Sequence, residues 1–133
     1  MQLTKRASYG LIATVELAIQ DGETPVSAGA IAQKYALPAP FVEKILHQLK
    51  ASGLVLSRKG RGGGYLLAGD PTSVTVREVL EALEESLDLV GCIGSESDCT
   101  VSGSCPTRHA WETIDRRFKE LLGSLSLADL VAG

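Results

Sequence analysis

The 133-residue sequence has few aromatic residues, few cysteines and no long hydrophobic run. Aromatic residues make up 5% of the chain and hydrophobic residues 44%, so we expect a core of Leu, Val, Ile and Ala, as in a small helical protein. No apolar run approaches the roughly 20 residues of a membrane span, and the first residues lack the apolar stretch of a secretory signal. We therefore expect a soluble, cytoplasmic protein with no membrane partner.

The sequence also lacks the usual signatures of an enzyme. We find no general-base pair and no cofactor fingerprint. Its glycine run, residues 60–64, does not end in the Gly-Lys-Ser/Thr of a phosphate-binding loop and lies between two predicted strands. The three cysteines are an odd number, which argues against a disulfide framework in a reducing compartment. These absences favour a binding protein with metal or redox chemistry at its cysteines.

The charge is distributed unevenly along the chain. Residues 1–69 contain eight Lys/Arg and four Asp/Glu, whereas residues 70–133 contain five and twelve. A basic segment in a protein of net charge -3 is compatible with phosphate binding, although scattered surface charge is the simpler explanation. The length allows one compact domain or a small domain with a dimerisation element. We expect a DNA-binding domain over 1–70 and a sensor loop with a dimerisation helix over 71–133.

Hydrophobic periodicity predicts three helices in the first half. The first covers residues 8–20, and the second begins after Ser27, which suits an N-cap, and ends before Pro38. The third runs from there to Ser52-Gly53, with a buried stripe that includes Val42 and Leu49. Two helices joined by a four-residue turn form a helix-turn-helix pattern. In the first helix we expect one apolar face, formed by Leu11, Ile12, Val15, Ala18 and Ile19.

A β-hairpin follows the helix-turn-helix. Residues 54–56 and 65–67 are short apolar strands, and the segment between them is basic and rich in glycine. Lys44, His47 and Lys50 recur on the side of the third helix opposite its apolar stripe, where a recognition helix meets the major groove. The hairpin would contact the adjacent backbone phosphates. The predicted DNA-binding residues are Lys5, Pro40, Glu43, Lys44, His47, Lys50, Arg58, Lys59, Arg61 and Gly62.

The second half predicts two helices separated by an irregular loop. Thr75 and Glu78 resemble a capping box that opens the first of them. Residues 91–105 show no periodicity, and a long helix starts near Pro106. This helix carries apolar residues at the spacing of a coiled coil and would dimerise through them. The predicted seam is Trp111, Ile114, Phe118, Leu121 and Leu125.

The three cysteines, Cys92, Cys99 and Cys105, lie together in the predicted loop, and His109 follows one turn into the helix. Thiolates favour zinc, copper(I) or iron-sulfur clusters. Structural zinc sites usually present paired Cys-x2-4-Cys knuckles, which are absent here, whereas wider spacing suits a multi-iron cluster. Unligated thiols remain the simple alternative. A catalytic cysteine is disfavoured because no Cys-His-Asp arrangement is evident.

The order of elements and several motifs resemble the Rrf-type family of winged helix-turn-helix transcriptional regulators. The matching parts are residues 3–5 with Tyr9, residues 53–55, the wing at 60–67, the three-cysteine loop and the ending at 125–130. The resemblance implies a mainly α fold with a small β-hairpin wing and a long C-terminal dimerisation helix. It further implies a homodimer that binds a palindromic operator in double-stranded DNA, as a repressor or an activator, under the control of a 2Fe-2S or 4Fe-4S cluster.

In this family Cys92, Cys99 and Cys105 match the cluster ligands. IscR-like members place a histidine three residues after the third cysteine, where this sequence has Arg108, and His109 follows it. NsrR-like members use a carboxylate from the partner chain, and the corresponding residue here is Ser8, a poor ligand. His109 is therefore our candidate for the fourth ligand. The alternative function is a regulator of the same family whose cysteines form a thiol switch or a zinc site and which senses through a protein partner.

Overall fold

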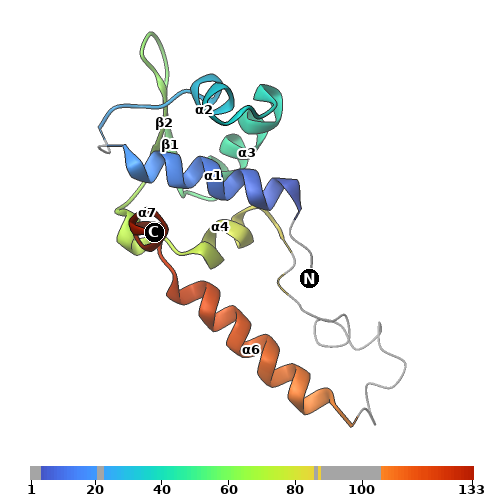
Figure 1. Ribbon diagram of the computed structural model, residues 1–133. Helices are drawn as coiled ribbons and strands as arrows, with labels where there is room; N and C mark the ends of the chain where they lie inside the picture. Colours follow the sequence, from blue (N-terminus) through green and yellow to red (C-terminus); the bar gives the residue numbers. More distant parts are fainter. Residues whose placement is uncertain (1–3, 21–22, 86, 88–105) are drawn as a thin grey trace.

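The computed structural model describes residues 4–20, 23–85, 87 and 106–133. In chain order these residues form α1 (Lys5–Ile19), α2 (Ala28–Tyr35), α3 (Ala39–Ala51), β1 (Val55–Arg58), β2 (Gly64–Leu67), the 3-10 turn η1 (Pro71–Ser73), α4 (Val76–Ala82), α6 (Arg108–Ser124) and α7 (Leu127–Ala132). Every element except α6 packs into one body, which we call the head, and α6 projects from it as an arm (Figure 1). A mainly helical chain with one β-hairpin and a long C-terminal helix confirms the predicted fold class.

Side-chain caps explain where several helices begin. The Ser27 hydroxyl accepts a hydrogen bond from the Ala30 amide at 3.0 Å, and the Thr75 hydroxyl accepts one from Glu78 at 3.1 Å, so both predicted caps are confirmed. Each cap satisfies an amide that has no partner within its own helix. α2 ends at Ala36, which adopts a left-handed conformation, and Pro38 then sets the start of α3. These local signals separate the two helices of the helix-turn-helix.

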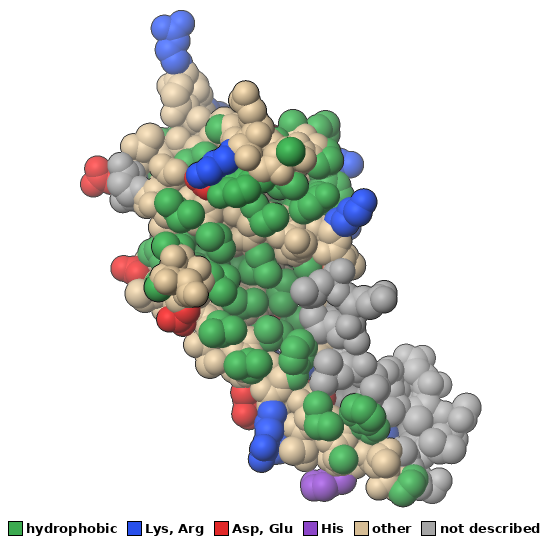
Figure 2. Space-filling view, viewed as in Figure 1, with side chains coloured by type: hydrophobic (Ala, Val, Ile, Leu, Met, Phe, Trp, Pro, Cys, Tyr) green, Lys and Arg blue, Asp and Glu red, His purple; other side chains and the backbone are tan. Residues whose placement is uncertain are grey.

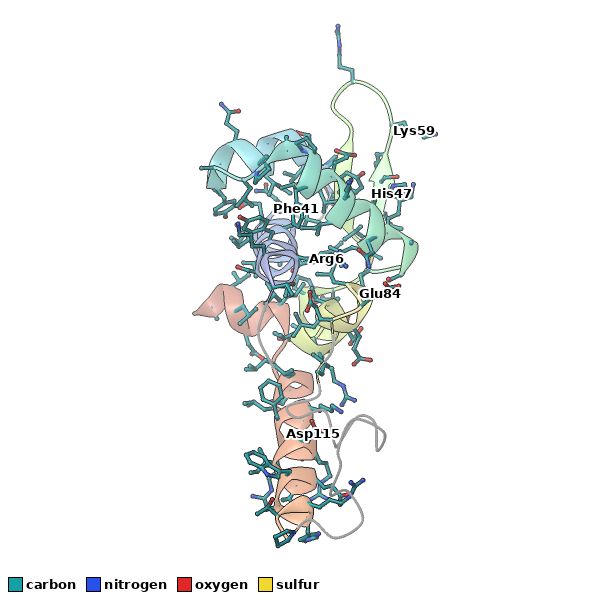
Figure 3. The ribbon with its side chains drawn as sticks, turned by 90° about the vertical axis from the view of Figure 1, so that its right-hand side faces the viewer. Arg6, Phe41, His47, Lys59, Glu84 and Asp115 are labelled. Atoms are coloured by element: carbon teal, nitrogen blue, oxygen red, sulfur yellow. The ribbon has the colours of Figure 1, made fainter. Side chains whose placement is uncertain are left out.

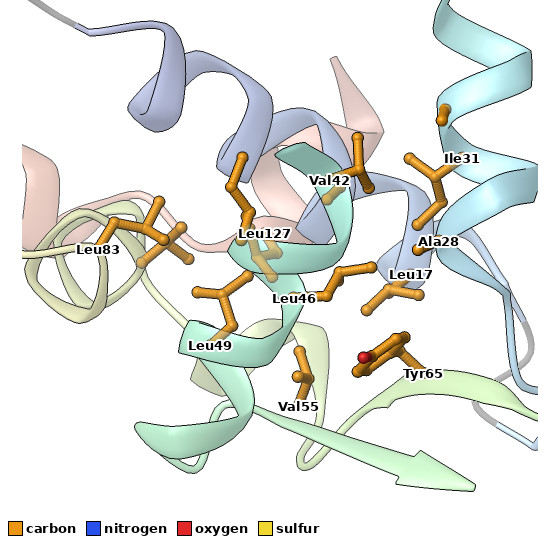
Figure 4. Packing of buried hydrophobic residues seen from close by; sticks show 14 of the residues in the cluster. Leu17, Ala28, Ile31, Val42, Leu46, Leu49, Val55, Tyr65, Leu83 and Leu127 are labelled. Carbon is orange, nitrogen blue, oxygen red and sulfur yellow. The ribbon is translucent and has the colours of Figure 1, made fainter. Parts of the chain in front are cut away.

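The core of the head joins residues from both ends of the chain. Its fully buried side chains come from α1, α2, α3, β1, α7 and the end of α4 (Figure 4). The largest of them are Ile31, Val42, Leu46, Leu49, Val55, Val79, Leu83 and Leu127. Leu127 lies near the C-terminus yet is completely buried in this cluster. α3 is therefore held by a core to which α4 and α7, on either side of the cysteines in the sequence, both contribute.

The apolar face predicted for α1 is only partly buried. Ile19 is exposed, and Leu11, Val15 and Ala18 lie only at the margin of the core. The buried residues are smaller: Ala7, Gly10, Ala13, Thr14, Glu16 and Leu17. A β-carbon at position 10 would lie 2.3 Å from a methyl carbon of Leu83, so only glycine allows α1 to approach this close. Small residues permit tight packing against the neighbouring helices, and the bulkier stripe is left half-buried.

The C-terminal segment forms two helices where one seam from residue 111 to residue 125 was predicted. α6 ends at Ser124, Leu125 is extended, and Ser126 and Asp129 form a complete capping box that starts α7. The Leu125 carbonyl accepts a hydrogen bond from the Val76 amide at 2.9 Å, and the Leu125 side chain packs against the head. Leu125 therefore does not belong to the exposed seam. Within the described residues no helix is long and apolar enough to cross a membrane.

Candidate DNA-binding surface and cysteine sensor

α3 separates its apolar and basic residues cleanly. Val42, Ile45, Leu46 and Leu49 are buried in the head, because they recur on one side of the helix. The opposite side is open to solvent, and it carries all the predicted DNA-binding residues of this helix: Pro40, Glu43, Lys44, His47 and Lys50. A helix held on one face by a core and exposed on the other presents its charged side chains without further rearrangement.

Two grooves flank this exposed side. One, of about 540 Å³, runs along α3 between Glu43, Lys44, His47 and the left-handed residue Glu84 at the end of α4. The other, of about 410 Å³, contains Lys5 and Arg6 from the start of α1, with Phe41 of α3. The fold thus brings Lys5 close to the start of the recognition helix, although the two are far apart in the sequence.

The wing is a short antiparallel hairpin. β1 pairs with β2 from Val55 opposite Leu67 to Arg58 opposite Gly64, and each strand is one residue longer than predicted. Arg58, Lys59, Arg61 and Gly62 are all exposed, and the turn that carries them extends away from the head (Figures 1 and 3). A β-carbon on Gly63 would lie 2.2 Å from the Arg58 carbonyl oxygen, so this tight turn requires glycine.

Tyr65 connects the wing to both helices of the helix-turn-helix. Its hydroxyl donates a hydrogen bond to the Glu43 carboxylate of α3 at 2.9 Å. Its amide and carbonyl pair with Val26, directly before α2, at 2.8 and 3.0 Å. Burial and the hydrogen bond to Glu43 both raise the pKa of Tyr65, so the phenol stays protonated and remains a donor at neutral pH.

One exposed residue of α3 and one of the wing lie along the same edge of the head. In Figure 3 His47 on α3 and Lys59 in the wing both lie along one edge of the head, and Glu84 lies below them. Base edges and backbone phosphates lie next to each other along a DNA groove, so a helix and a wing that share one side can contact both. This arrangement matches the geometry of a winged helix bound at a major groove.

A buried carboxylate holds α1 and α2 together behind this surface. Glu16 is 2% exposed and accepts hydrogen bonds from Lys34 at 2.8 and 2.9 Å, from Gln20 at 3.1 Å and from the Tyr35 hydroxyl. Burial raises the pKa of Glu16, but the hydrogen bonds and the Lys34 charge outweigh it, so the pKa lies below its usual value. The ionised carboxylate of Glu16 is therefore stabilised in its buried position.

α6 presents an apolar face that the head does not cover. Trp111 is 39% exposed, Ile114 46% and Leu121 55%, while Phe118 between them is half-buried. Among the described helices α6 packs chiefly on α4. Hydrophobic side chains gather along the visible side of α6 in Figure 2. The predicted seam residues other than Leu125 therefore share one accessible stripe.

Cys92, Cys99 and Cys105 lie outside the described residues. His109 is described: it is exposed in the first turn of α6, four residues after Cys105. Within the part of the chain that the structure describes, no three His, Cys, Asp or Glu side chains are grouped as a metal site would require. Three thiolates and one imidazole are nevertheless a donor set that iron-sulfur clusters use. The candidate ligands thus fit such a cluster by their chemistry.

A helix-turn-helix with a basic outer face, followed by a basic wing, defines a winged helix-turn-helix transcriptional regulator. Residues 3–133 match the family model Rrf2, described as an iron-dependent transcriptional regulator, and the chain belongs to this family. It is 35% identical over 131 residues to the HTH-type transcriptional regulator IscR of Xenorhabdus nematophila, covering 98% of this chain and 79% of that protein. Because its relatives are transcriptional regulators, the protein is a regulator and not an enzyme.

Solved structures of regulators share the fold along nearly the whole chain. CymR, the global cysteine regulator of B. subtilis, superposes with a TM-score of 0.85 at 31% identity, covering 99% of this chain and 97% of CymR. IscR of T. potens superposes with a TM-score of 0.75, also at 31% identity, covering 99% of this chain and 87% of that one. This chain is therefore similar both to regulators named IscR and to one named a global cysteine regulator.

Sequence patterns alone did not reveal two contacts that stabilise the DNA-binding region. The Tyr65–Glu43 contact joins residues on different elements, and no spacing of residues in the sequence predicts it. The burial of Glu16 was also missed, because a glutamate in an amphipathic helix is normally assigned to the solvent side. Lys34-Tyr35, a cation and a hydroxyl donor side by side on the next helix, was the one available hint that a carboxylate is buried nearby.

Proposed function

We propose that the protein is a homodimeric repressor or activator that binds a palindromic operator through α3 and the wing, and that an iron-sulfur cluster on Cys92, Cys99 and Cys105 controls this binding. The observations that carry the DNA-binding part are the exposed basic residues Lys44 and Lys50 on α3 and Arg58, Lys59 and Arg61 in the wing. His47 of α3 and Lys59 of the wing lie along one edge of the head (Figure 3). We place base contacts on α3 and phosphate contacts on the wing.

Two copies would meet through α6. Its stripe of Trp111, Ile114, Phe118 and Leu121 is too apolar to remain in water, and α4 covers only another part of the helix. An isologous contact between two such stripes covers both at once. A two-fold dimer places two recognition helices in opposite orientations, which is the symmetry of a palindromic site.

The cluster would be held by the three cysteine thiolates, with His109 as the fourth ligand. His109 is exposed in the first turn of α6, so its imidazole is accessible. Bound there, the cluster would supply a centre that responds to iron, oxygen, nitric oxide or redox state. The three cysteines belong to the segment between α4 and α6 and His109 to α6 itself, so cluster binding would alter the spacing of the two heads.

A second candidate function keeps the DNA-binding surface and changes the sensor. The similarity to CymR, a global cysteine regulator, supports a regulator whose cysteines respond as thiols or hold zinc and which senses through a protein partner. The two candidates share every residue of the DNA-binding surface. They differ in the chemistry of the three cysteines and in whether a protein partner delivers the signal.

The DNA-binding part can be tested without knowing the operator in advance. We would select binding sequences from a random duplex library with the purified protein and measure affinity for the selected site by fluorescence anisotropy. We expect an inverted repeat whose half-sites are about one helical turn apart. We also expect a log-log salt dependence with a clearly negative slope. Selection of no sequence, or of one without two-fold symmetry, would contradict a dimeric operator-binding protein.

A further inference from the structure

The wing is too short to hold its own position relative to α3. Its two strands pair over only four residues each, and an isolated two-stranded hairpin is marginally stable in water. The basic turn, with Lys59 and Arg61, lies beyond the last pair of strand residues. The place where this turn meets DNA is therefore set by the contacts at the base of the hairpin.

Tyr65 supplies contacts on two sides of that base. Through its backbone it forms two hydrogen bonds to Val26, next to the start of α2, and through its hydroxyl it bonds to Glu43 on α3. A β-carbon on the preceding residue, Gly64, would lie 2.5 Å from the Val26 carbonyl, so the hairpin and this loop are in direct contact. Tyr65 is itself 9% exposed, which limits its rotamers.

Glu43 has little else in the described structure to fix it. It lies on the exposed side of α3, and the hydrogen bond from Tyr65 is its only one to a described residue. The bond therefore joins a buried group of the wing to an otherwise solvent-facing group of the recognition helix. Charge-assisted hydrogen bonds of this kind are stronger and more directional than neutral ones.

We propose that Tyr65 is a positioning residue for DNA binding: its hydroxyl, bonded to Glu43, fixes the wing at the angle to α3 from which Arg61 reaches the DNA. This inference rests on the proposed DNA-binding function and extends it, because Tyr65 itself is buried and does not contact DNA. The wing and the recognition helix then bind DNA as one rigid unit. Without the hydroxyl the hairpin keeps its backbone pair with Val26 and the buried Val55 but loses its hydrogen bond to α3, so Arg61 reaches its phosphate only part of the time.

The test is a double-mutant cycle between Arg61 and Tyr65, which have no direct contact in the proposal. Operator affinity is measured by anisotropy for the wild type, Arg61→Ala, Tyr65→Phe and the double variant. We expect Arg61→Ala to weaken binding about tenfold in the wild type, as for one charged hydrogen bond. In the Tyr65→Phe background we expect it to weaken binding less than about threefold, because the contact is already partly lost.

Matched variants separate positioning from packing. Tyr9→Phe makes the same chemical change in a tyrosine that packs edge-to-face on Phe41, and it should leave the cost of Arg61→Ala at about tenfold. Glu43→Gln keeps an oxygen that can accept from Tyr65 and should preserve most of that cost. Glu43→Ala removes the acceptor and should lower the cost of Arg61→Ala as much as Tyr65→Phe does. If Tyr65→Phe does not fold, Glu43→Ala provides the test instead.

The outcomes are distinct. An equal cost of Arg61→Ala in the wild-type, Tyr65→Phe and Glu43→Ala backgrounds would overturn the positioning role while leaving the wing contact intact. A wild-type protein that is indifferent to Arg61→Ala would contradict the wing contact itself, and the positioning role would fall with it. Thermal unfolding of each variant, followed by circular dichroism, checks that a loss of folded protein does not imitate a loss of affinity.

Discussion

The head and the arm differ in how far they bury their leucine and isoleucine side chains. In the head, Leu46, Leu49 and Leu127 have no exposed surface, and their neighbours come from helices at both ends of the chain. In the arm, Leu121 and Ile114 are about half exposed although they have the same chemistry. Among the described residues, the large side chains at the centre of the head are fully buried, whereas the apolar stripe of α6 stays exposed within one chain. A second copy of the chain is the cover that we propose for this stripe.

The largest expected effect comes from placing a charge on the apolar stripe of α6. Leu121→Asp should raise the dimer dissociation constant by about a thousandfold, because a carboxylate buried in an apolar interface costs ~4 kcal/mol. The helix content of the monomer should stay nearly unchanged, since Leu121 is exposed within one chain. Sedimentation velocity and circular dichroism measure the two quantities.

Arg116→Asp is the control for that experiment. Arg116 is exposed on α6 and lies roughly opposite the apolar stripe, where its nearest acidic partner is Glu120 at 3.8 Å. We expect this variant to remain dimeric. Dissociation of both variants alike would mean that added negative charge, and not the stripe, determines assembly.

The same leucine chemistry should have a different consequence in the head. Leu46→Ala removes a side chain with no exposed surface and should lower the free energy of unfolding by ~3 kcal/mol, through lost burial and the cavity that remains. Denaturation with urea at several protein concentrations measures this loss. Leu121→Ala is the matched substitution in the arm, and its effect should shrink as the protein is diluted, because only dimers lose contact area.

These two regions also show how far the sequence could be interpreted. Helix caps, the turn at Pro38 and the glycine-rich hairpin are local signals, and they predicted the helix-turn-helix and the wing within a few residues. The buried face of α1 depends on which neighbours approach it, and the close contact of Gly10 with Leu83 cannot be deduced from periodicity. Leu125 fitted the heptad spacing but packs on the head, because the Ser126 capping box interrupts the helix.

The Glu16 cluster tests whether the head depends on a polar contact as well as on its core. Glu16→Ala should lower the free energy of unfolding by ~2 kcal/mol, since it leaves the Lys34 and Tyr35 donors without this acceptor. The pKa of Glu16 is lowered in the folded protein, so its contribution is present above the usual value of 4.5 and is lost as the pH falls through the folded value. Glu16→Gln should flatten the acid limb of stability against pH. An unchanged acid limb would show that other carboxylates determine it.

The smallest of these effects concerns the exposed wing. Arg61→Ala should weaken operator binding by ~1.4 kcal/mol and reduce the slope of log affinity against log salt by about one, as for one lost phosphate contact. The unfolding free energy should not change, because Arg61 is exposed. Arg117→Ala on the arm is the matched control, and it should alter neither the affinity nor the slope.

The central claim is that the cysteines hold an iron-sulfur cluster that controls operator binding. The direct test is a paired measurement on anaerobically purified protein: visible absorbance with an iron and sulfide assay, and operator affinity of the loaded and cluster-free forms. We predict charge-transfer absorbance, iron and sulfide in the wild type, loss of all three in Cys99→Ala, and a different affinity for the two forms. A colourless wild type after reconstitution, or a Cys99→Ala variant with unaltered absorbance and affinity, would contradict the claim and favour the thiol or zinc regulator.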